Sequence, residues 1–188
     1  MIIGLTGGIG SGKSQVSSLL KEKGFEIIDA DLISREVTMP GSPALKELAD
    51  YFGSDILDKN EILNRKLLGE RAFSSKENTN KLNSIITSRI IDSAKEKLKD
   101  NCIFDAPTLL ENGLQSIVDY VLVVTAEKEL RIKRVSARDG LSRKKILDIM
   151  KNQMPEKEKV KLADYVIYNN GSFEDLSDAV NAFVNMIK

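Results

Sequence analysis

The sequence predicts a three-layer α/β/α fold with a five-stranded parallel sheet. The chain has 188 residues, which suits one domain with a substantial core. Apolar residues make up 41% and charged residues 30%, as in ordinary globular proteins. Short apolar runs alternate with helical patterns, which is typical of strands covered by helices on both faces. The expected strands are Ile2–Leu5, Phe25–Ile28, Cys102–Phe104, Tyr120–Val124 and Tyr165–Ile167.

Helix signals lie between these runs. The first helix should begin near Gly12 and stop at Gly24, which can serve as a C-cap. Residues 34–100 show no convincing strand, and Ser74–Glu77 resembles a capping box that opens a long helix. We therefore expect a helical insert between the second and third strands. The last helix should begin near Ser172–Asp175.

Composition limits the function and the location. Basic and acidic residues number 28 each, so no net charge attracts the chain to nucleic acid or to membranes. No apolar run reaches the roughly 18 residues of a membrane span, and Met1–Gly4 does not resemble a leader. The single cysteine, Cys102, suits a reducing cytoplasm and reads as a small buried hydrophobe. Because histidine is absent, a catalytic base would be a carboxylate or a lysine.

A glycine-rich segment follows the first expected strand and matches the P-loop pattern of nucleotide-binding proteins. Its glycines allow successive N–H groups to point at phosphate, and the following helix adds its positive end. Lys13 should reach the outer phosphates of ATP, and the Ser14 hydroxyl should coordinate Mg²⁺. The alternative is a chance glycine-rich turn. The predicted ATP-binding residues here are Gly8, Ile9, Gly10, Ser11, Gly12, Lys13, Ser14 and Gln15.

Carboxylates end two of the expected strands. Asp105 follows Cys102–Phe104, where a carboxylate can hold Mg²⁺ beside Ser14, although strand ends often carry a capping Asp. Asp29 and Asp31 end the second strand, at the sheet edge where ligands of α/β proteins bind. One of them could accept a proton from an attacking hydroxyl, or Asp31 could cap the next helix. Local sequence leaves both interpretations open.

Arginines recur along one predicted helix face. Arg131, Arg134 and Arg138 stand at i, i+3 and i+7, and Arg143 follows in a polar stretch. Guanidinium groups on a closing lid could clamp the transferring phosphate. The alternative is a solvated basic face.

Nine segments spread along almost the whole chain form one further pattern: Ile3–Ser14, Asp29–Asp31, Pro40–Leu45, Phe52–Gly53, Leu82–Ile85, Asp105–Pro107, Gln153, Lys161–Ile167 and Asn169–Gly171. Together they resemble the dephospho-coenzyme A kinase family. The resemblance implies transfer of the ATP γ-phosphate to the ribose 3′-hydroxyl of dephospho-coenzyme A, the final step of coenzyme A biosynthesis.

The resemblance also implies an architecture and residue roles. It divides one P-loop kinase domain into a core (1–32, 99–133 and 162–188), an acceptor-binding insert (about 33–98) and a lid (about 134–161). It makes Asp31 the preferred general base. The expected catalytic groups are then Asp31, Lys13 and Arg138, and the expected nucleotide contacts on the lid side are Arg134 and Arg138. We expect a cytoplasmic monomer that uses ATP and Mg²⁺ and binds neither nucleic acid nor membranes.

The chain departs from the family pattern at a few positions. Thr87-Ser88 replaces a common His-Pro, which puts acceptor binding in question. Smaller departures are Asn64-Arg65 for Asp-Arg, Gln15 for Thr, and Thr108 for Leu.

Two rival functions share the P-loop. A nucleoside monophosphate or shikimate-type kinase has the same core and lid, and a nucleotide-binding switch or silent homologue would bind ATP without transfer. The sequence lacks the Asn-Lys-x-Asp segment of GTPases and the Leu-Ser-Gly-Gly-Gln segment of transporter ATPases.

Overall fold

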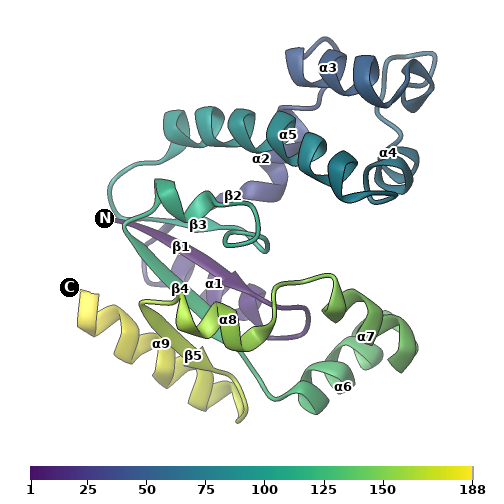
Figure 1. Cartoon of the computed structure of the whole chain (residues 1–188). Coiled ribbons are helices and arrows are strands. Elements are labelled where there is room, and N and C mark those ends of the chain that lie inside the picture. Colours follow the sequence, from purple (N-terminus) through teal and green to yellow (C-terminus); the bar gives the residue numbers. More distant parts are fainter. Residues whose placement is uncertain (188) are drawn as a thin grey trace. The chain divides into compact units, whose positions relative to one another are not determined.

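The computed structural model describes residues 1–187 and divides into two compact units (Figure 1). The first combines Met1–Ile28 with the chain from Leu98 onward, and the second is Asp29–Lys97. Each unit has its own hydrophobic core. Within residues 1–187, every helix is too short or too polar to cross a bilayer.

The sheet has five strands in the order β2-β3-β1-β4-β5. The β1–β3, β1–β4 and β4–β5 pairs are parallel, so the predicted five-stranded parallel sheet is confirmed. Most strands continue one or two residues past their apolar runs because ladder pairing does not require apolar side chains. Phe25, however, is buried just before β2 rather than within it. The strands are β1 (Ile2–Gly7), β2 (Glu26–Asp29), β3 (Cys102–Asp105), β4 (Tyr120–Thr125) and β5 (Tyr165–Tyr168).

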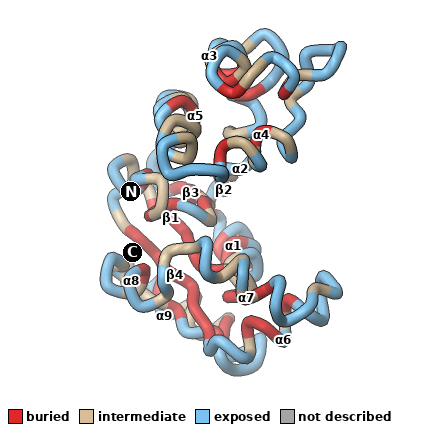
Figure 2. Tube along the Cα trace, turned by 45° about the vertical axis from the view of Figure 1, so that its right-hand side comes forward, coloured by how far each residue is buried: buried red, intermediate tan, exposed pale blue. Residues whose placement is uncertain are grey.

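Alternation along β1 divides its side chains between the two faces of the sheet. Ile3 and Leu5 are fully buried in a cluster with α1 (Lys13–Glu22) and α9 (Phe173–Ile187). Gly4 faces the other way, where an added Cβ would lie 2.8 Å from the Leu109 side chain. Figure 2 shows the buried stretches of β1 and β4 in red. Helices and connecting segments therefore cover both faces.

Helix α9 begins at Phe173, within the start predicted at Ser172–Asp175, and a capping box that was not predicted stabilises its first turn. The Asp175 N–H donates to the Ser172 hydroxyl at 3.2 Å, and the Ser172 N–H donates back to the Asp175 carboxylate at 2.8 Å. These hydrogen bonds hold the pKa of Asp175 below its usual value. The two side chains satisfy helix N–H groups that would otherwise lack partners.

Three short helices separate β4 from β5: α6 (Lys128–Asp139), α7 (Arg143–Lys151) and α8 (Glu156–Lys161). The first two pack together through a small cluster of Ile132, Val135 and Ile146. Helix α8 contacts β4. These helices span the predicted lid.

The second unit is helical, as predicted, and among residues 30–97 the structure shows one isolated β bridge, between Leu57 and Leu63. Its core includes Leu48, Phe52 and Ile85. The elements are α2 (Ala30–Glu36), α3 (Pro43–Phe52), η1 (Ser54–Ile56), α4 (Arg65–Ala72) and α5 (Lys76–Lys97).

Helix α5 corrects one prediction and explains one departure. Its N-cap is Ser75, whose hydroxyl accepts from the Asn78 N–H at 3.1 Å, so the cap predicted at Ser74 was wrong by one residue.

Thr87 and Ser88 lie within the unbroken helix, and the Ser88 hydroxyl donates to the Ser84 carbonyl at 3.2 Å. A proline at position 88 would remove a helix N–H and clash with the preceding turn.

Candidate active site

The P-loop spans Gly8–Gly12 between the end of β1 and the start of α1. Gly10 and Gly12 have φ values of +77° and +94°, in the left-handed region that favours glycine. Space also requires glycine at position 12, because an added Cβ would lie 2.1 Å from the Asn169 amide nitrogen. The loop therefore has the compact, glycine-dependent form that a phosphate cradle needs.

Lys13 and Asp105 form an ion pair beside this loop. The register of β1 and β3 pairs Leu5 with Asp105, so the acid stands at the carboxyl edge of the sheet where the loop begins. Both side chains are largely buried, with 19% and 13% exposed. The pair brings together a lysine, which in P-loop enzymes binds the phosphates, and a carboxylate of the kind that holds Mg²⁺.

The oxygens of Ser14 and Asp105 suit Mg²⁺. Ser14 lies in the first turn of α1, and its hydroxyl makes no hydrogen bond within residues 1–187. The same part of the chain contains no group of three His, Cys, Asp or Glu side chains placed to hold a metal. Mg²⁺ commonly takes only one or two protein oxygens and completes its shell with phosphate and water. The donor set therefore fits a magnesium ion that arrives with ATP.

The predicted arginine face separates into three environments. Arg131 is 5% exposed, Arg134 contacts the end of β5, and only Arg138 is largely exposed. Arg138 donates to both carboxylate oxygens of Asp139 at 2.7 Å, which lowers the pKa of Asp139. Arg138 would have to leave Asp139 to reach phosphate, so its predicted role stays a prediction.

Arg134 contributes to the site through Asn169. Its guanidinium donates to the Asn169 carbonyl at 2.9 Å and to the side-chain oxygen at 3.3 Å. The Asn169 amide donates in turn to the Ser11 carbonyl at 2.9 Å. This chain of hydrogen bonds links the predicted lid helix to the P-loop. Its direct nucleotide contact stays a prediction.

The two acids at the carboxyl end of β2, Asp29 and Asp31, have different tasks within the second unit. Asp29 caps α2, because its carboxylate accepts from the N–H groups of Asp31 at 2.7 Å and Leu32 at 3.3 Å. The alternative that Asp31 is the cap was therefore wrong. Asp31 lies in the first turn with an exposed side chain, and its role as base stays a prediction.

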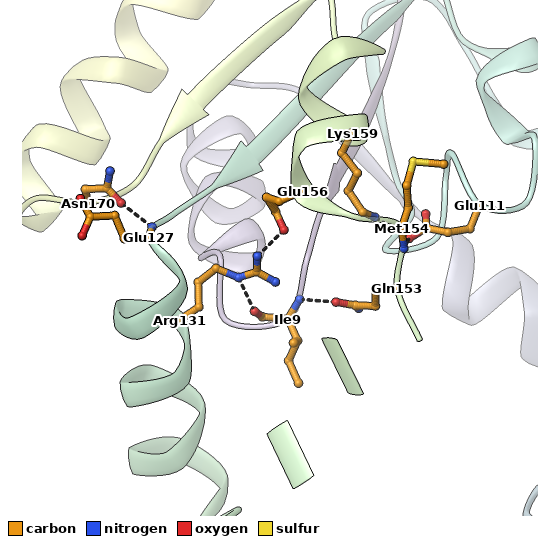
Figure 3. Close-up of polar contacts among 9 residues, drawn as sticks. All are labelled: Ile9, Glu111, Glu127, Arg131, Gln153, Met154, Glu156, Lys159 and Asn170. Atoms are coloured by element: carbon orange, nitrogen blue, oxygen red, sulfur yellow. Dashed lines mark hydrogen bonds and ion pairs between the residues drawn. The ribbon is translucent and has the colours of Figure 1, made fainter. Parts of the chain in front are cut away.

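The sequence interpretation missed a group of buried charges near the P-loop (Figure 3). Arg131 pairs with Glu156, and the fully buried Lys159 pairs with Glu111 at 2.6 Å. Neither glutamate belongs to a sequence motif, and from sequence alone charged residues on short helices are expected to be exposed to solvent. Gln153 was noted only as part of the family resemblance, without a role. The structure gives it a direct contact with Ile9.

Comparison with known proteins places this site in a family. The family model for dephospho-CoA kinase matches residues 1–175. The chain belongs to the dephospho-CoA kinase family. A curated dephospho-CoA kinase from Fusobacterium nucleatum is 44% identical over all of this chain and 98% of its own length.

Solved structures agree with the family assignment. The crystal structure of TT1252 from Thermus thermophilus is 33% identical, has a TM-score of 0.83, and aligns over 100% of this chain and 98% of its own. Dephospho-CoA kinase from Campylobacter jejuni is 26% identical, has a TM-score of 0.73, and aligns over 99% and 96%. The predicted P-loop kinase fold and the predicted family are thus confirmed. Membership in the dephospho-CoA kinase family also disfavours the nucleoside monophosphate and shikimate-type rivals.

Proposed function

We propose that this protein transfers the γ-phosphate of ATP to the ribose 3′-hydroxyl of dephospho-coenzyme A, giving coenzyme A. The observation that carries the proposal is the Lys13–Asp105 pair beside a complete P-loop, in a chain that matches dephospho-CoA kinases along its length.

Lys13 and the P-loop amides would bind and orient the phosphates. On ATP binding, Lys13 exchanges Asp105 for a phosphate oxygen and so supplies charge where it develops in the transition state. Ser14 and Asp105 would hold Mg²⁺, which neutralises phosphate charge and fixes the ATP geometry. The residues assigned to nucleotide binding remain Gly8–Gln15, Arg134 and Arg138.

The second unit supplies the acceptor side of the proposal. Asp31 takes the proton of the attacking hydroxyl as the bond to the γ-phosphorus forms and the bond to the β–γ bridging oxygen breaks. Its carboxylate suits this role because Asp29 already caps α2. Residues 33–98 would bind the acceptor, and residues 134–161 would close as a lid.

One assay tests the assignment. The protein is incubated with Mg²⁺-ATP and either dephospho-coenzyme A, nucleoside monophosphates or shikimate, and the product is identified by mass spectrometry and NMR. We expect one phosphate on the ribose 3′-oxygen of dephospho-coenzyme A. Preference for another acceptor, or ATP binding without transfer, would overturn the assignment. We also expect the protein to be cytoplasmic, which suits its single cysteine, Cys102, a free and buried thiol. We expect it to be a monomer, and sedimentation of the purified protein tests this.

A further inference from the structure

Side chains from two distant segments hold both backbone groups of Ile9 (Figure 3). The Ile9 N–H donates to Gln153 Oε1 at 2.9 Å, and the Ile9 carbonyl accepts from Arg131 Nε at 2.9 Å. Arg131 belongs to α6, whereas Gln153 lies between α7 and α8. Ile9 is in the P-loop, so these bonds tie the loop to the helices that follow β4. We call Gln153 and Arg131 the Ile9 clamp.

Further contacts fix both members of the clamp. Arg131 also pairs with Glu156, and its burial leaves the guanidinium little freedom. The residue after Gln153 is Met154, whose N–H donates to the Glu111 carboxylate at 3.1 Å. Glu111 is held in turn by Lys159, which is fully buried. The backbone next to Gln153 is therefore held in place through Glu111 and Lys159, which fixes the position of the Gln153 side chain.

The neighbouring loop amides differ from that of Ile9. The N–H groups of Gly10 and Gly12 donate to no protein atom among residues 1–187, whereas the Ile9 N–H is occupied. The Ile9 carbonyl and the Gly10 N–H belong to one planar peptide and point in opposite directions. By holding that carbonyl, Arg131 sets the direction in which the Gly10 N–H points.

We propose that Gln153 and Arg131 are positioning residues that fix the peptides on either side of Ile9, so that the next loop amides face phosphate. The inference rests on the proposed ATP site and revises it at one residue: within Gly8–Gln15, Ile9 holds the loop in place instead of donating its N–H to phosphate. Preorganised donors strengthen phosphate binding because they need not reorient when the ligand arrives.

The test replaces Gln153 with methionine, which keeps the side-chain length and removes the oxygen acceptor. Gln115→Met is the matched control, because Gln115 is exposed and its side chain forms no hydrogen bond within residues 1–187. In ATP-free protein we expect hydrogen exchange of the Ile9 amide to accelerate about tenfold, the scale of one lost hydrogen bond. Affinity for a non-hydrolysable Mg²⁺-ATP analogue should fall about three- to tenfold for the same reason.

The acceptor provides a readout that a general structural defect would change. In Gln153→Met, kcat should fall about tenfold, the scale of a slightly misplaced phosphate. The KM for dephospho-coenzyme A and the melting temperature should stay at their wild-type values. Arg131→Lys keeps the charge beside Glu156, but its single ammonium lacks the guanidinium's fork of donors, so analogue affinity should change in the same direction.

Three results would overturn the inference. Unchanged Ile9 exchange and unchanged analogue affinity would show that the clamp does not position the loop. Tighter analogue binding in Gln153→Met would show that Gln153 competes with phosphate. In the third case, both clamp variants would bind ATP and dephospho-coenzyme A more weakly to the same extent and would have a lower melting temperature. That result would indicate that the clamp has a structural role alone. If the wild type binds the analogue but makes no coenzyme A, the proposed function fails, and the exchange and affinity tests still decide the clamp.

Discussion

The two units of the molecule differ in whether they bury charged side chains. The first unit buries Arg131 and Lys159 near the P-loop and pairs them with glutamates. The second unit keeps its ion pairs at the surface, including Arg71–Asp55 and Lys97–Glu36, and fills its core with apolar side chains. Removing charges from water costs free energy, whereas exposed pairs cost and contribute little.

This difference reflects what each set of charges contacts. Arg131 and Glu111 hydrogen-bond to backbone groups of Ile9 and Met154, so they fix the course of the chain beside the P-loop. A loop rich in glycine has little packing of its own to set its shape. We infer that the buried charges replace that packing, whereas the second unit obtains its order from an ordinary apolar core.

The largest expected effect lies in the second unit, at the proposed base. Asp31→Asn should lower kcat by about 10² to 10⁴, the usual contribution of general base catalysis. ATP binding and melting temperature should change little, because Asp29 rather than Asp31 caps α2. Asp29→Asn is the matched control, since asparagine caps helices about as well as aspartate. Full turnover by Asp31→Asn would require another base.

In the first unit, Lys13→Ala should lower kcat/KM by at least about a hundredfold, because one preorganised charge on the transition state is lost. Lys21→Ala, on the same helix but exposed, should keep wild-type kinetics. Steady-state assays of both variants check this prediction. Near wild-type turnover by folded Lys13→Ala protein would contradict the assignment of the P-loop to the active site.

Buried and exposed pairs can be compared directly through stability. Lys159→Met leaves Glu111 without its partner and should lower the free energy of unfolding by about 2–3 kcal/mol, since Glu111 keeps some contact with water. Lys81→Met breaks the surface pair with Glu47 and should cost less than about 1 kcal/mol. Urea unfolding measures both. Equal losses would contradict the contrast between the two units.

The smallest effect concerns the Arg71–Asp55 pair and its dependence on pH. Arg71 holds the pKa of Asp55 below its usual value by hydrogen bonding to the carboxylate. A lowered pKa in the folded state stabilises the fold above the ordinary Asp pKa of about 3.9, and this contribution disappears as pH falls through the lowered value. The urea midpoints of wild type and Arg71→Gln should therefore differ at pH 7 and converge in acid. A constant gap would assign the effect to packing or to the Phe52 carbonyl contact.

Local patterns predicted much of this molecule because their causes are local. Glycine spacing, apolar runs and the acids expected in the first turn of the last helix act over a few residues, and the structure confirms the elements that they predict. Errors arose where similar polar residues lie one or two positions apart. Ser75 caps α5 instead of Ser74, and Asp29 caps α2 instead of Asp31, because backbone geometry selects among neighbours of similar propensity.

By itself, the sequence determined the P-loop, the strand-end acid Asp105, the helical character of residues 34–100 and the resemblance to dephospho-CoA kinases. Only the tertiary structure decided how the arginines of α6 divide, with Arg131 buried, Arg134 on Asn169 and Arg138 exposed. It alone brought Gln153 to Ile9, across 144 positions of sequence. Helical periodicity shows which residues share a face, but the partners of that face come from distant segments, and only folding brings them together.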